Sequence, residues 1–489
     1  MNVADLLLAS SREHPDKAAL ITPSGAAVTF SEAAARAGSV ARNLASAGVS
    51  SGERVAIAVH NVPEFVYSYF GILAAGAVVV PLNPMLTERE ARRVLEDSET
   101  SLVLGVAPAG DAAERAAAER GIRYVEAGEW AAGRAELAPA AASPGDLAVL
   151  AYTSGTTGDP KGAMLGHGNL LANVDQQMSV DARVDHSDVL LLSLPLFHIF
   201  GLNVTLGLLA RTGASGVLTD RFEPVECLRL IQQHRVTVMF GAPTMYAALV
   251  ATPGADQYDL SSVRLAISGA APLAPETLRG FKELFGVDVY EGYGLTETAP
   301  TLTSNRVANA PRPGSIGKPL PGVEIRLVDE TGAEVELGDP GEIVARGPNV
   351  FHGYWRKQDE TQRAFTDDGW FRTGDVAVQD EDGYLYIVDR KRDLVIVSGF
   401  NVFPSEVEQA LVENPKVAEA AVVGVPHPYT GEAVKAFVVL EPGAEAREDE
   451  LIADVHTRLA RFKCPRSIEV VDQLPHLLTG KVLRRALRT

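Results

Sequence analysis

Ala151-Tyr152-Thr153-Ser154-Gly155-Thr156-Thr157-Gly158-Asp159-Pro160-Lys161-Gly162 is the stretch on which the fold prediction rests. The apolar residues 147–152 lead into it and predict a strand. Its glycines let the backbone turn N–H groups towards a phosphate, and Lys161 supplies a positive charge. The spacing differs from a Walker A loop, because Lys161 follows a proline rather than a glycine. We predict a phosphate-binding loop, with an ordinary polar surface loop as the alternative.

Upstream of this loop the chain alternates strand-like and helix-like patterns. We expect a hairpin over residues 18–30, turning at Pro23-Ser24-Gly25, and short strands at 54–59, 78–81 and 101–106. Thr29 with Glu32, and Thr87 with Glu90, have the spacing of capping boxes at helix starts. This alternation predicts a parallel sheet with covering helices. Residues 107–144 hold few large apolar side chains, and we expect a surface excursion there.

Beyond residue 312 the pattern changes to short strands separated by glycine and proline turns, for example at 323–328, 341–346 and 384–388. We predict an α/β protein whose large N-terminal domain, residues 1–390, combines βα-layered subdomains with a β-rich subdomain over about 312–390. The charged run at 389–393 suggests a hinge at 391–393. A small, mobile α+β C-terminal domain over 394–489 follows, with a further capping box at Ser405 and Glu408.

Bulk properties limit the classes of partner. The formal net charge of −19 argues against binding to nucleic acid or to an anionic membrane. The longest apolar stretch, residues 65–81, contains polar and turn-forming residues and reads as a buried helix followed by a buried strand, not as a membrane span. Cys227 and Cys464 are far apart in the sequence, which makes a disulfide framework or zinc site unexpected and favours a cytoplasmic location.

Five later segments accompany the loop. They read Pro195-Leu196-Phe197-His198-Ile199-Phe200-Gly201, Tyr290-Glu291-Gly292-Tyr293-Gly294-Leu295-Thr296-Glu297-Thr298, Gly369-Trp370-Phe371-Arg372-Thr373-Gly374-Asp375, Asp389-Arg390-Lys391-Arg392-Asp393 and Thr479-Gly480-Lys481-Val482-Leu483-Arg484. In their order the six segments resemble the adenylate-forming superfamily, which includes AMP-dependent acyl-CoA synthetases such as fatty-acid–CoA ligases, luciferases and peptide-synthetase adenylation domains. The resemblance spans nearly the whole chain. It implies an ATP-dependent enzyme that converts a carboxylic acid to an acyl-adenylate and then to a thioester.

The resemblance also implies an ATP site. Its expected members are Thr153, Ser154, Gly155, Thr156, Thr157, Gly158, Lys161, Gly269, Ala270, Ala271, Glu291, Gly292, Tyr293, Gly294, Thr296, Asp375, Ile387, Arg390 and Lys481. The loop would hold the β- and γ-phosphates, Tyr293 would stack on adenine, and Asp375 would bind the ribose hydroxyls. Glu297, with Thr153, would hold Mg²⁺. The plainer readings are a helix-start carboxylate for Glu297 and an Asx turn for Asp375.

Four residues would be catalytic by resemblance: Lys481, His198, Glu297 and Arg390. Lys481 would bridge the substrate carboxylate and the α-phosphate, and His198 would gate the acyl site. The plainer readings are a surface charge for Lys481 and a packing residue for His198. One departure from the family pattern is Pro475-His476-Leu477, where relatives often have Pro-Lys-Thr. Arg392 would be the hinge about which the C-terminal domain rotates, and coenzyme A would approach Ser398, Gly399 and Phe400.

The acyl site is expected at His198, Asn203, Gly241, Met245, Gly269, Gly294 and Thr298. Residues 197–203 contain no acidic side chain, so an amino-acid substrate is not expected, and the apolar surroundings suggest a fatty acid or, next, an aryl acid. Coenzyme A is the expected acceptor. Three alternatives stay open: transfer to a carrier protein's phosphopantetheine, an aryl acid–CoA ligase, and a catalytically dead binding protein. The oligomeric state is also open, with a homodimer as one option.

Overall fold

The computed structural model describes residues 1–108, 110–153, 160–308, 310–390, 393, 395–397, 400–427, 431–459, 461, 463–476 and 482–487. The chain forms two compact units. The first comprises Met1–Glu324 and Ala345–Phe371, and the second comprises Ile325–Val344 and Arg372–Thr489. Residues 391 and 392 of the predicted hinge lie outside the described residues, so the predicted boundary there stays a prediction. The predicted α/β fold class is confirmed.

The first unit contains a nine-stranded sheet within its described residues. In spatial order its strands are β15 (Lys318–Pro319), β14 (Thr301–Ser304), β13 (Val289–Gly294), β12 (Leu265–Ser268), β11 (Val238–Gly241), β9 (Val189–Leu192), β10 (Ser215–Leu218), β1 (Ala18–Ile21) and β2 (Ala27–Thr29). The strands from β13 to β1 pair in parallel, and antiparallel strands close both edges. The predicted hairpin is confirmed as β1 and β2, and Gly25 adopts φ +86° in its turn.

A six-stranded sheet forms the other part of this unit. Its order is β6 (Arg123–Glu126), β5 (Thr100–Gly105), β3 (Arg54–Ala58), β4 (Val78–Pro81), β7 (Leu147–Thr153) and β8 (Lys161–Gly166). Every pairing is parallel except that of β7 with β8. The predicted parallel sheet is therefore confirmed, and the phosphate-loop region lies in the hairpin between its last two strands.

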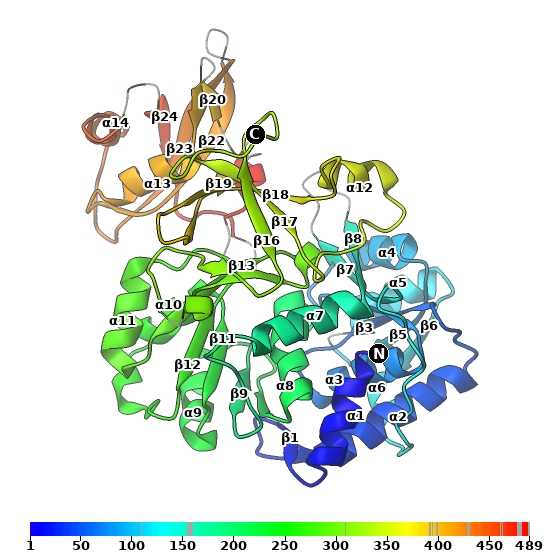
Figure 1. Cartoon of the computed structure of the whole chain (residues 1–489). Coiled ribbons are helices and arrows are strands. Elements are labelled where there is room, and N and C mark those ends of the chain that lie inside the picture. The colour runs from blue at the N-terminus through cyan, green and yellow to red at the C-terminus, as the bar shows by residue number, and fades with distance from the viewer. Residues whose placement is uncertain are drawn as a thin grey trace. The chain divides into compact units, whose positions relative to one another are not determined.

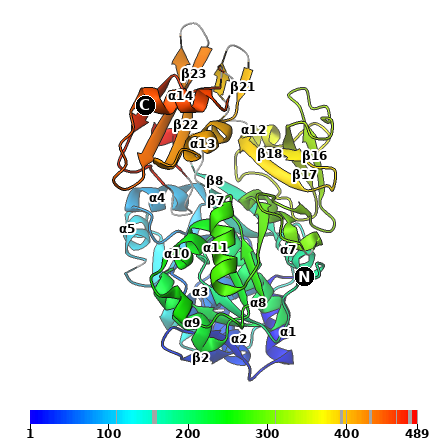
Figure 2. The ribbon, with the colours of Figure 1, turned by 90° about the vertical axis from the view of Figure 1, so that its left-hand side faces the viewer.

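Alternate residues of the central strands face two different cores, as the two-residue repeat of a strand requires. Val238 and Phe240 belong to one core, and Met239 between them belongs to the other. The first core is shared with the six-stranded sheet and with α1 (Ala4–Glu13), α2 (Phe30–Ser46), α3 (Pro63–Ala74), α7 (His167–Met178) and α8 (Gly207–Thr212) (Figure 1). The second is covered by α9 (Pro224–His234), α10 (Pro243–Ala251) and α11 (Pro275–Phe285), drawn in green in Figure 2.

Both capping boxes predicted for this unit are confirmed. Thr29 caps α2 with Glu32, and Thr87 caps α4 (Glu88–Asp97) with Glu90. The prediction for residues 107–144 was wrong. This segment supplies α5 (Asp111–Glu119), the edge strand β6 and α6 (Ala127–Ala131). Ala113, Ala116 and Ala117 of α5 are buried, because small side chains let this helix approach the sheet closely.

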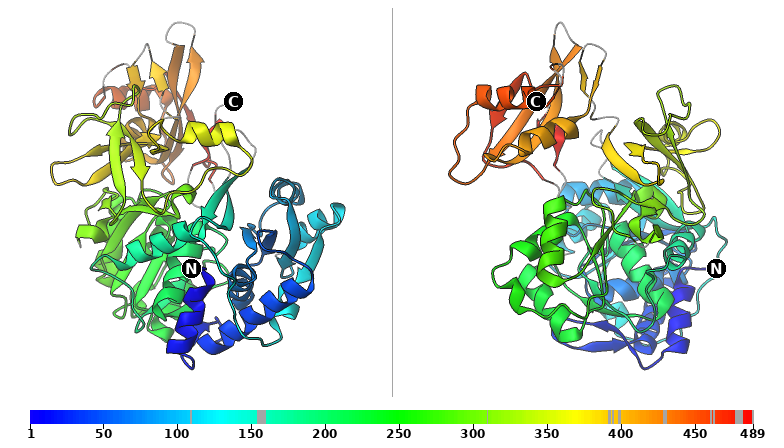
Figure 3. Two further views of the ribbon diagram at one scale, coloured as in Figure 1. Left: turned by 45° about the vertical axis from the view of Figure 1, so that its right-hand side comes forward. Right: turned by 60° about the vertical axis from the view of Figure 1, so that its left-hand side comes forward.

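The second unit contains two antiparallel-rich sheets. One is formed by β16 (Glu324–Val328), β17 (Gly341–Arg346), β18 (Phe371–Gln379) and β19 (Leu385–Arg390). The other is formed by β21 (Phe400–Val402), β20 (Val395–Val397), β23 (Gly431–Leu440), β22 (Val417–His427) and β24 (Ser467–Val470). One core joins the second sheet to α13 (Pro404–Val412) and α14 (Glu448–His456), the orange and red helices of Figure 3.

The capping box predicted at Ser405 and Glu408 was wrong. Phe403 is the N-cap of α13, because Pro404 occupies the first helical position. The Ser405 hydroxyl donates to the Val388 carbonyl oxygen, and Glu408 accepts from the Val422 N–H at 2.7 Å. The apolar stretch at 65–81 is confirmed as a helix, α3, followed by β4. No described helix is long and apolar enough to cross a membrane.

Candidate active site

The hairpin of β7 and β8 carries the predicted phosphate loop. The strands pair antiparallel, with Thr153 opposite Lys161, so the two ends of the loop lie side by side. The predicted loop residues Ser154, Gly155, Thr156, Thr157 and Gly158 lie outside the described residues, and only the backbone of Thr153 is described. Lys161 is described in full as the first residue of β8.

Lys161 has two partners from one downstream segment. Its ammonium forms an ion pair with Glu360 of α12 (Gln358–Ala364). It also lies 5.3 Å from the centroid of the Tyr354 ring, within the range of a cation–π interaction. The positive charge that we expect to meet phosphate is thus held against a carboxylate and an aromatic ring.

The backbone of residues 352–355 runs alongside β8. The Met164 N–H donates to the Gly353 carbonyl oxygen at 2.9 Å, and the Trp355 N–H donates to that of Gly162 at 2.8 Å. Gly353 adopts φ +119°, and a Cβ there would lie 2.4 Å from the Thr361 side chain, so only glycine fits. This segment is consequently anchored to the strand that begins with Lys161.

Glu297 lies in η3 (Thr296–Thr298), a single turn that follows β13. Its side chain is buried, and its Oε1 accepts from the Tyr354 hydroxyl at 2.8 Å. Its backbone carbonyl oxygen accepts from the Phe351 N–H at 2.8 Å. The structure therefore brings together two predicted residues, Lys161 and Glu297, through a third residue that the motif analysis missed.

The turn after Glu297 is held by amide side chains of α7. Asn173 bonds both the carbonyl oxygen and the N–H of Thr301, at 2.8 and 3.2 Å. Gln176 donates to Asn349, whose own amide donates to the carbonyl oxygens of Thr298 and Thr301. The motif analysis did not identify these buried amide side chains. They could have been found from their spacing, because Asn169, Asn173, Gln176 and Gln177 share one face of α7.

The predicted base-lining segments meet at the carboxyl ends of two neighbouring parallel strands, where ligands bind in many α/β sheets. Ser268 of β12 pairs with Glu291 of β13, so residues 269–271 and 291–294 begin side by side. Ala270 adopts φ +74°, which is uncommon for a residue other than glycine. A Cβ at Gly294 would lie 1.8 Å from the Pro300 carbonyl oxygen, so this position requires glycine. Gly292 and Tyr293 continue β13 opposite Ser304 and Thr303.

Glu291 is 5% exposed. Burial raises the pKa of its carboxyl group to about 7, against the hydrogen bond from the Leu273 backbone, which lowers it. Oε2 accepts from the Leu273 N–H at 3.2 Å. Oε1 is buried and makes no hydrogen bond to any described residue. Glu291 is therefore a carboxyl group that the fold favours in its neutral form.

His198 precedes the π-helical turn η1 (Phe200–Leu206), and such turns are common at functional sites. Its Nδ1 accepts from the Phe200 N–H at 3.2 Å, which places any proton of a neutral ring on Nε2. Phe200 packs edge-on against Phe240, the residue before Gly241. A Cβ at Gly269 would lie 3.0 Å from the Phe200 ring. Three predicted acyl-site residues, His198, Gly241 and Gly269, thus adjoin Phe200 or Phe240.

Three other predicted acyl-site residues are engaged in local structure. Both amide hydrogens of Asn203 are donated to backbone carbonyls, those of Leu170 and Ala299. The Thr298 hydroxyl bonds within its own turn, to Leu295 and Pro300. The Met245 sulfur accepts from the Ala242 N–H at 3.3 Å. Any contact of these three with a substrate would therefore involve their apolar or remaining atoms.

The second unit holds the remaining candidates. Asp375 in β18 is 5% exposed and stands opposite Arg390 of β19, and Ile387 stands opposite Ala377. The Asp375 N–H donates to the Thr373 hydroxyl at 3.1 Å, a turn made by the threonine side chain and not the Asx turn of the plainer reading. Arg390 and Phe400 are described by their backbones alone. Four predicted residues lie outside the described residues, namely Lys481, Arg392, Ser398 and Gly399.

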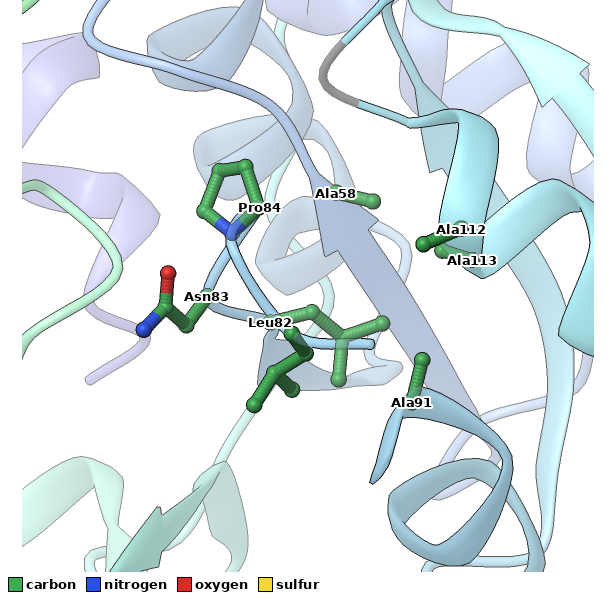
Figure 4. Close-up of a pocket in the computed structure, with 8 residues that line it drawn as sticks. Ala58, Leu82, Asn83, Pro84, Ala91, Ala112 and Ala113 are labelled. Atoms are coloured by element: carbon green, nitrogen blue, oxygen red, sulfur yellow. The ribbon is translucent and has the colours of Figure 1, made fainter. Parts of the chain in front are cut away.

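Two cavities in the first unit lie away from the predicted site residues. One, shown in Figure 4, lies between β3, α4 and α5 and is lined by Ala58, Leu82, Asn83, Pro84, Leu86, Ala91, Ala112 and Ala113. Its volume of about 10 Å³ is room for about one water molecule. The other, about 370 Å³, is lined by residues of 107–130, including Tyr124 and Trp130. Neither contains a predicted site residue.

The model of the AMP-binding enzyme family matches residues 7–355, and that of the AMP-binding enzyme C-terminal domain matches residues 406–481. The chain is 36% identical to a long-chain-fatty-acid–CoA ligase of Bacillus subtilis (strain 168), over 99% of this chain and 93% of the relative. It is 39% identical to a feruloyl-CoA synthase of an Amycolatopsis species, over 95% and 94%.

Solved structures agree with these relatives. ATP-bound MatB from Rhodopseudomonas palustris has a TM-score of 0.92 at 38% identity, covering 100% of this chain and 98% of that one. The anthranilate CoA ligase AuaEII, in complex with anthranoyl-AMP, has a TM-score of 0.89 at 32% identity, covering 100% and 96%. Likeness of this extent involves the whole chain rather than one shared loop.

Proposed function

The chain belongs to the AMP-binding enzyme family and is an ATP-dependent, AMP-forming acyl-CoA ligase, and from this premise we propose how its residues carry out the two half-reactions. In the first, a carboxylate oxygen attacks the α-phosphorus of ATP, the bond to pyrophosphate breaks, and an acyl-adenylate forms. In the second, the thiol sulfur of coenzyme A attacks the acyl carbonyl carbon and AMP leaves. The nucleophiles come with the substrates, so the protein must orient them and neutralise charge.

The observation that carries the proposal is the adjacency of Lys161, Tyr354 and Glu297. Lys161, with residues 153–158, would bind the outer phosphates of ATP, displacing the Glu360 carboxylate with which it pairs. Tyr293 would stack on adenine, and Asp375 would bind the ribose. Lys481 would place its ammonium between the substrate carboxylate and the α-phosphate.

Mg²⁺ fits the donors present. No cluster of three or more acidic, histidine or cysteine residues suited to a metal occurs among the described residues. Glu297 offers a buried carboxylate that contacts the same tyrosine as the phosphate-binding lysine. This agrees with Mg²⁺ chemistry, in which one or two carboxylates and the substrate phosphates share the ion. Bound there with Glu297 and Thr153, the ion would offset phosphate charge.

We favour a fatty acid of medium or longer chain as the substrate. Phe200, Phe240 and Met245 are apolar, and Gly269 has no side chain beside the Phe200 ring, where a Cβ would lie only 3.0 Å away. No acidic side chain in residues 197–203 could pair with an ammonium group. An aryl acid is the second candidate. It is favoured by the edge-on pair of Phe200 and Phe240, a geometry that also suits a bound aromatic ring, and by the feruloyl-CoA relative.

Coenzyme A is the acceptor that we propose for this chain, with residues 398–400 approaching its pantetheine arm, and a carrier protein is the alternative. Rotation of residues 394–489 about 391–393 would separate the two half-reactions, with His198 as the gate beside the carboxylate. Both cysteines are free and buried, which favours the reducing cytoplasm as location. A homodimer is compatible with this scheme.

Pyrophosphate release over a library of carboxylic acids, with and without coenzyme A, tests the proposal. We expect release with fatty acids of at least medium length, and an acyl-CoA product only when coenzyme A is present. Release limited to aryl acids would replace the fatty-acid assignment with the second candidate. Release without any acyl-CoA would point to a carrier protein, and no release with any acid would contradict the proposed chemistry.

A further inference from the structure

Tyr354 contacts both charged groups that the proposed adenylation step needs. Its hydroxyl donates to Oε1 of Glu297 at 2.8 Å. The face of its ring lies 5.3 Å from the Lys161 ammonium. One side chain therefore contacts both the expected metal-binding carboxylate and the expected phosphate-binding lysine, although neither lies near it in the sequence.

Backbone hydrogen bonds on both sides of Tyr354 fix its position. Ala163 of β8 and Tyr354 form an antiparallel bridge, flanked by hydrogen bonds from Met164 to Gly353 and from Trp355 to Gly162. The Tyr354 N–H donates to the Thr361 hydroxyl at 2.9 Å. The ring packs edge-on against Phe351, with centroids 4.9 Å apart. Tyr354 is held by the strand that carries Lys161 and by the loop that leads to Glu360.

The Tyr354 hydroxyl is chemically suited to donate a hydrogen bond to the Glu297 carboxylate. A tyrosine phenol has an ordinary pKa of about 10. The hydroxyl is therefore protonated at neutral pH and donates to the carboxylate.

We propose that Tyr354 is a positioning residue for adenylation: its hydroxyl orients the Glu297 carboxylate towards the Mg²⁺ of the ATP complex, while its ring contacts Lys161. This inference rests on the proposed function, since it takes Glu297 as the metal-binding carboxylate. Glu360, which pairs with Lys161 from the same segment, keeps the lysine near the ring before ATP arrives.

Tyr354→Phe removes the hydroxyl and keeps the ring. The measurement is the dissociation constant of ATP by calorimetry, once with Mg²⁺ and once with a chelator and no metal. We expect about tenfold weaker binding with Mg²⁺, the effect of one lost hydrogen bond to a charged group, and no change without metal. Pyrophosphate release should require a correspondingly higher Mg²⁺ concentration for half-maximal rate, with an unchanged KM for the acid.

Tyr152→Phe is the matched control. The Tyr152 hydroxyl donates to Oδ2 of Asp97 at 2.6 Å, so the variant also removes a half-buried tyrosine–carboxylate bond from the same sheet. It should leave the Mg²⁺ dependence of ATP binding unchanged. In a Glu297→Gln background, Tyr354→Phe should have no further effect on Mg²⁺–ATP affinity, because the tyrosine acts through that carboxylate.

Equal weakening of ATP binding with and without Mg²⁺ would overturn the inference, and so would full additivity of the two substitutions. The readout is nucleotide binding rather than acid activation. A wild-type chain that binds Mg²⁺–ATP but activates no acid would therefore contradict the proposed function, while the comparison of Tyr354→Phe with wild type would still decide the role of Tyr354.

Discussion

The guanidinium of Arg306 donates twice to Gln177, from Nη1 to the side-chain oxygen at 2.7 Å and from Nη2 to the backbone oxygen at 3.1 Å. Its Nε donates to the Ala182 carbonyl oxygen at 2.9 Å. Arg306 is 1% exposed, and burial lowers the pKa of its guanidinium to about 10. The buried charge is thus solvated by carbonyl oxygens, and it ties the end of α7 to the turn after β14.

Arg306→Met should destabilise the first unit by about 2–4 kcal/mol, because it leaves buried carbonyl oxygens without donors. The change in urea midpoint of the first unfolding transition measures this. Arg229→Met is the control, since Arg229 is exposed on α9 and pairs with Glu226 at the surface. Surface pairs contribute at most about 1 kcal/mol. A shift for Arg306→Met no larger than that of the control would contradict the bracing role.

Lys481→Ala should abolish adenylation and leave thioester formation from a supplied acyl-adenylate intact. The physical reason is that the lysine is needed only where a carboxylate and a phosphate, both anions, must meet. Pyrophosphate release measures the first step, and acyl-CoA formation from synthetic acyl-adenylate measures the second. Lys416→Ala, at an exposed surface pair with Glu450, should affect neither. Equal loss of both steps would show that the role assigned to Lys481 is wrong.

Glu360→Gln should tighten ATP binding about three- to tenfold, since it removes a negative charge that competes with phosphate for Lys161, discounted for partial exposure. Calorimetric titration with ATP measures the change. Asp359→Asn removes a neighbouring exposed charge from the same helix and should alter affinity little. Weaker binding in Glu360→Gln would mean that the carboxylate orients Lys161 for phosphate rather than competing with it.

His167 should make the fold sensitive to mild acid. Burial lowers the pKa of its imidazole from 6.5 to about 4, and its Nδ1 accepts from the Val3 N–H at 3.0 Å. The unfolded chain therefore binds the proton first as pH falls, so stability is lost between pH 6.5 and 4. The loss should reach roughly 2 kcal/mol by pH 5.

The measurement is urea unfolding at pH 7 and pH 5, for the wild type and for His167→Asn, which keeps an acceptor for Val3. We expect the wild type to lose roughly 2 kcal/mol more than the variant over this interval. Parallel losses in the two proteins would show that His167 does not carry the acid sensitivity.

Glu291 should make the fold less stable as pH rises, whereas His167 makes it less stable as pH falls. Because burial raises the pKa of its carboxyl from 4.5 to about 7, the unfolded chain loses the proton first as pH rises. The stability that the neutral acid contributes is present in full below pH 4.5 and is lost across the interval up to pH 7. At pH 8 the free energy of unfolding is lower by roughly 3 kcal/mol than it is below pH 4.5.

Glu291→Gln should therefore stabilise the chain at pH 8 and change little at pH 5, as thermal unfolding at the two pH values would reveal. Glu283→Gln, at an exposed position of α11, is the control and should show no pH-dependent gain. Destabilisation of Glu291→Gln at pH 8 would mean that the carboxylate form is the one that the site requires.

Local signals explain which predictions succeeded. The capping boxes at Thr29 and Thr87, and the hairpin at residues 18–30, depend on residues within a few positions of each other. The capping box at Ser405 failed because Pro404 moved the helix start, and residues 107–144 were misjudged because buried alanines resemble exposed ones in composition. Of the candidate site, the order of six segments was enough to indicate the family, whereas side-chain partners were not.

The sequence by itself determined the strand that leads into residues 153–161, the alternation that builds a parallel sheet, and the residues that identify an acid-activating enzyme. Only the tertiary structure decided what surrounds them. Tyr354 and Glu297 are 57 residues apart, yet their side chains share a hydrogen bond. The cause is long-range: residues 352–355 pair with β8, and that register points one tyrosine at both Lys161 and Glu297. No local periodicity encodes such a pairing, because it depends on two distant segments meeting on one strand.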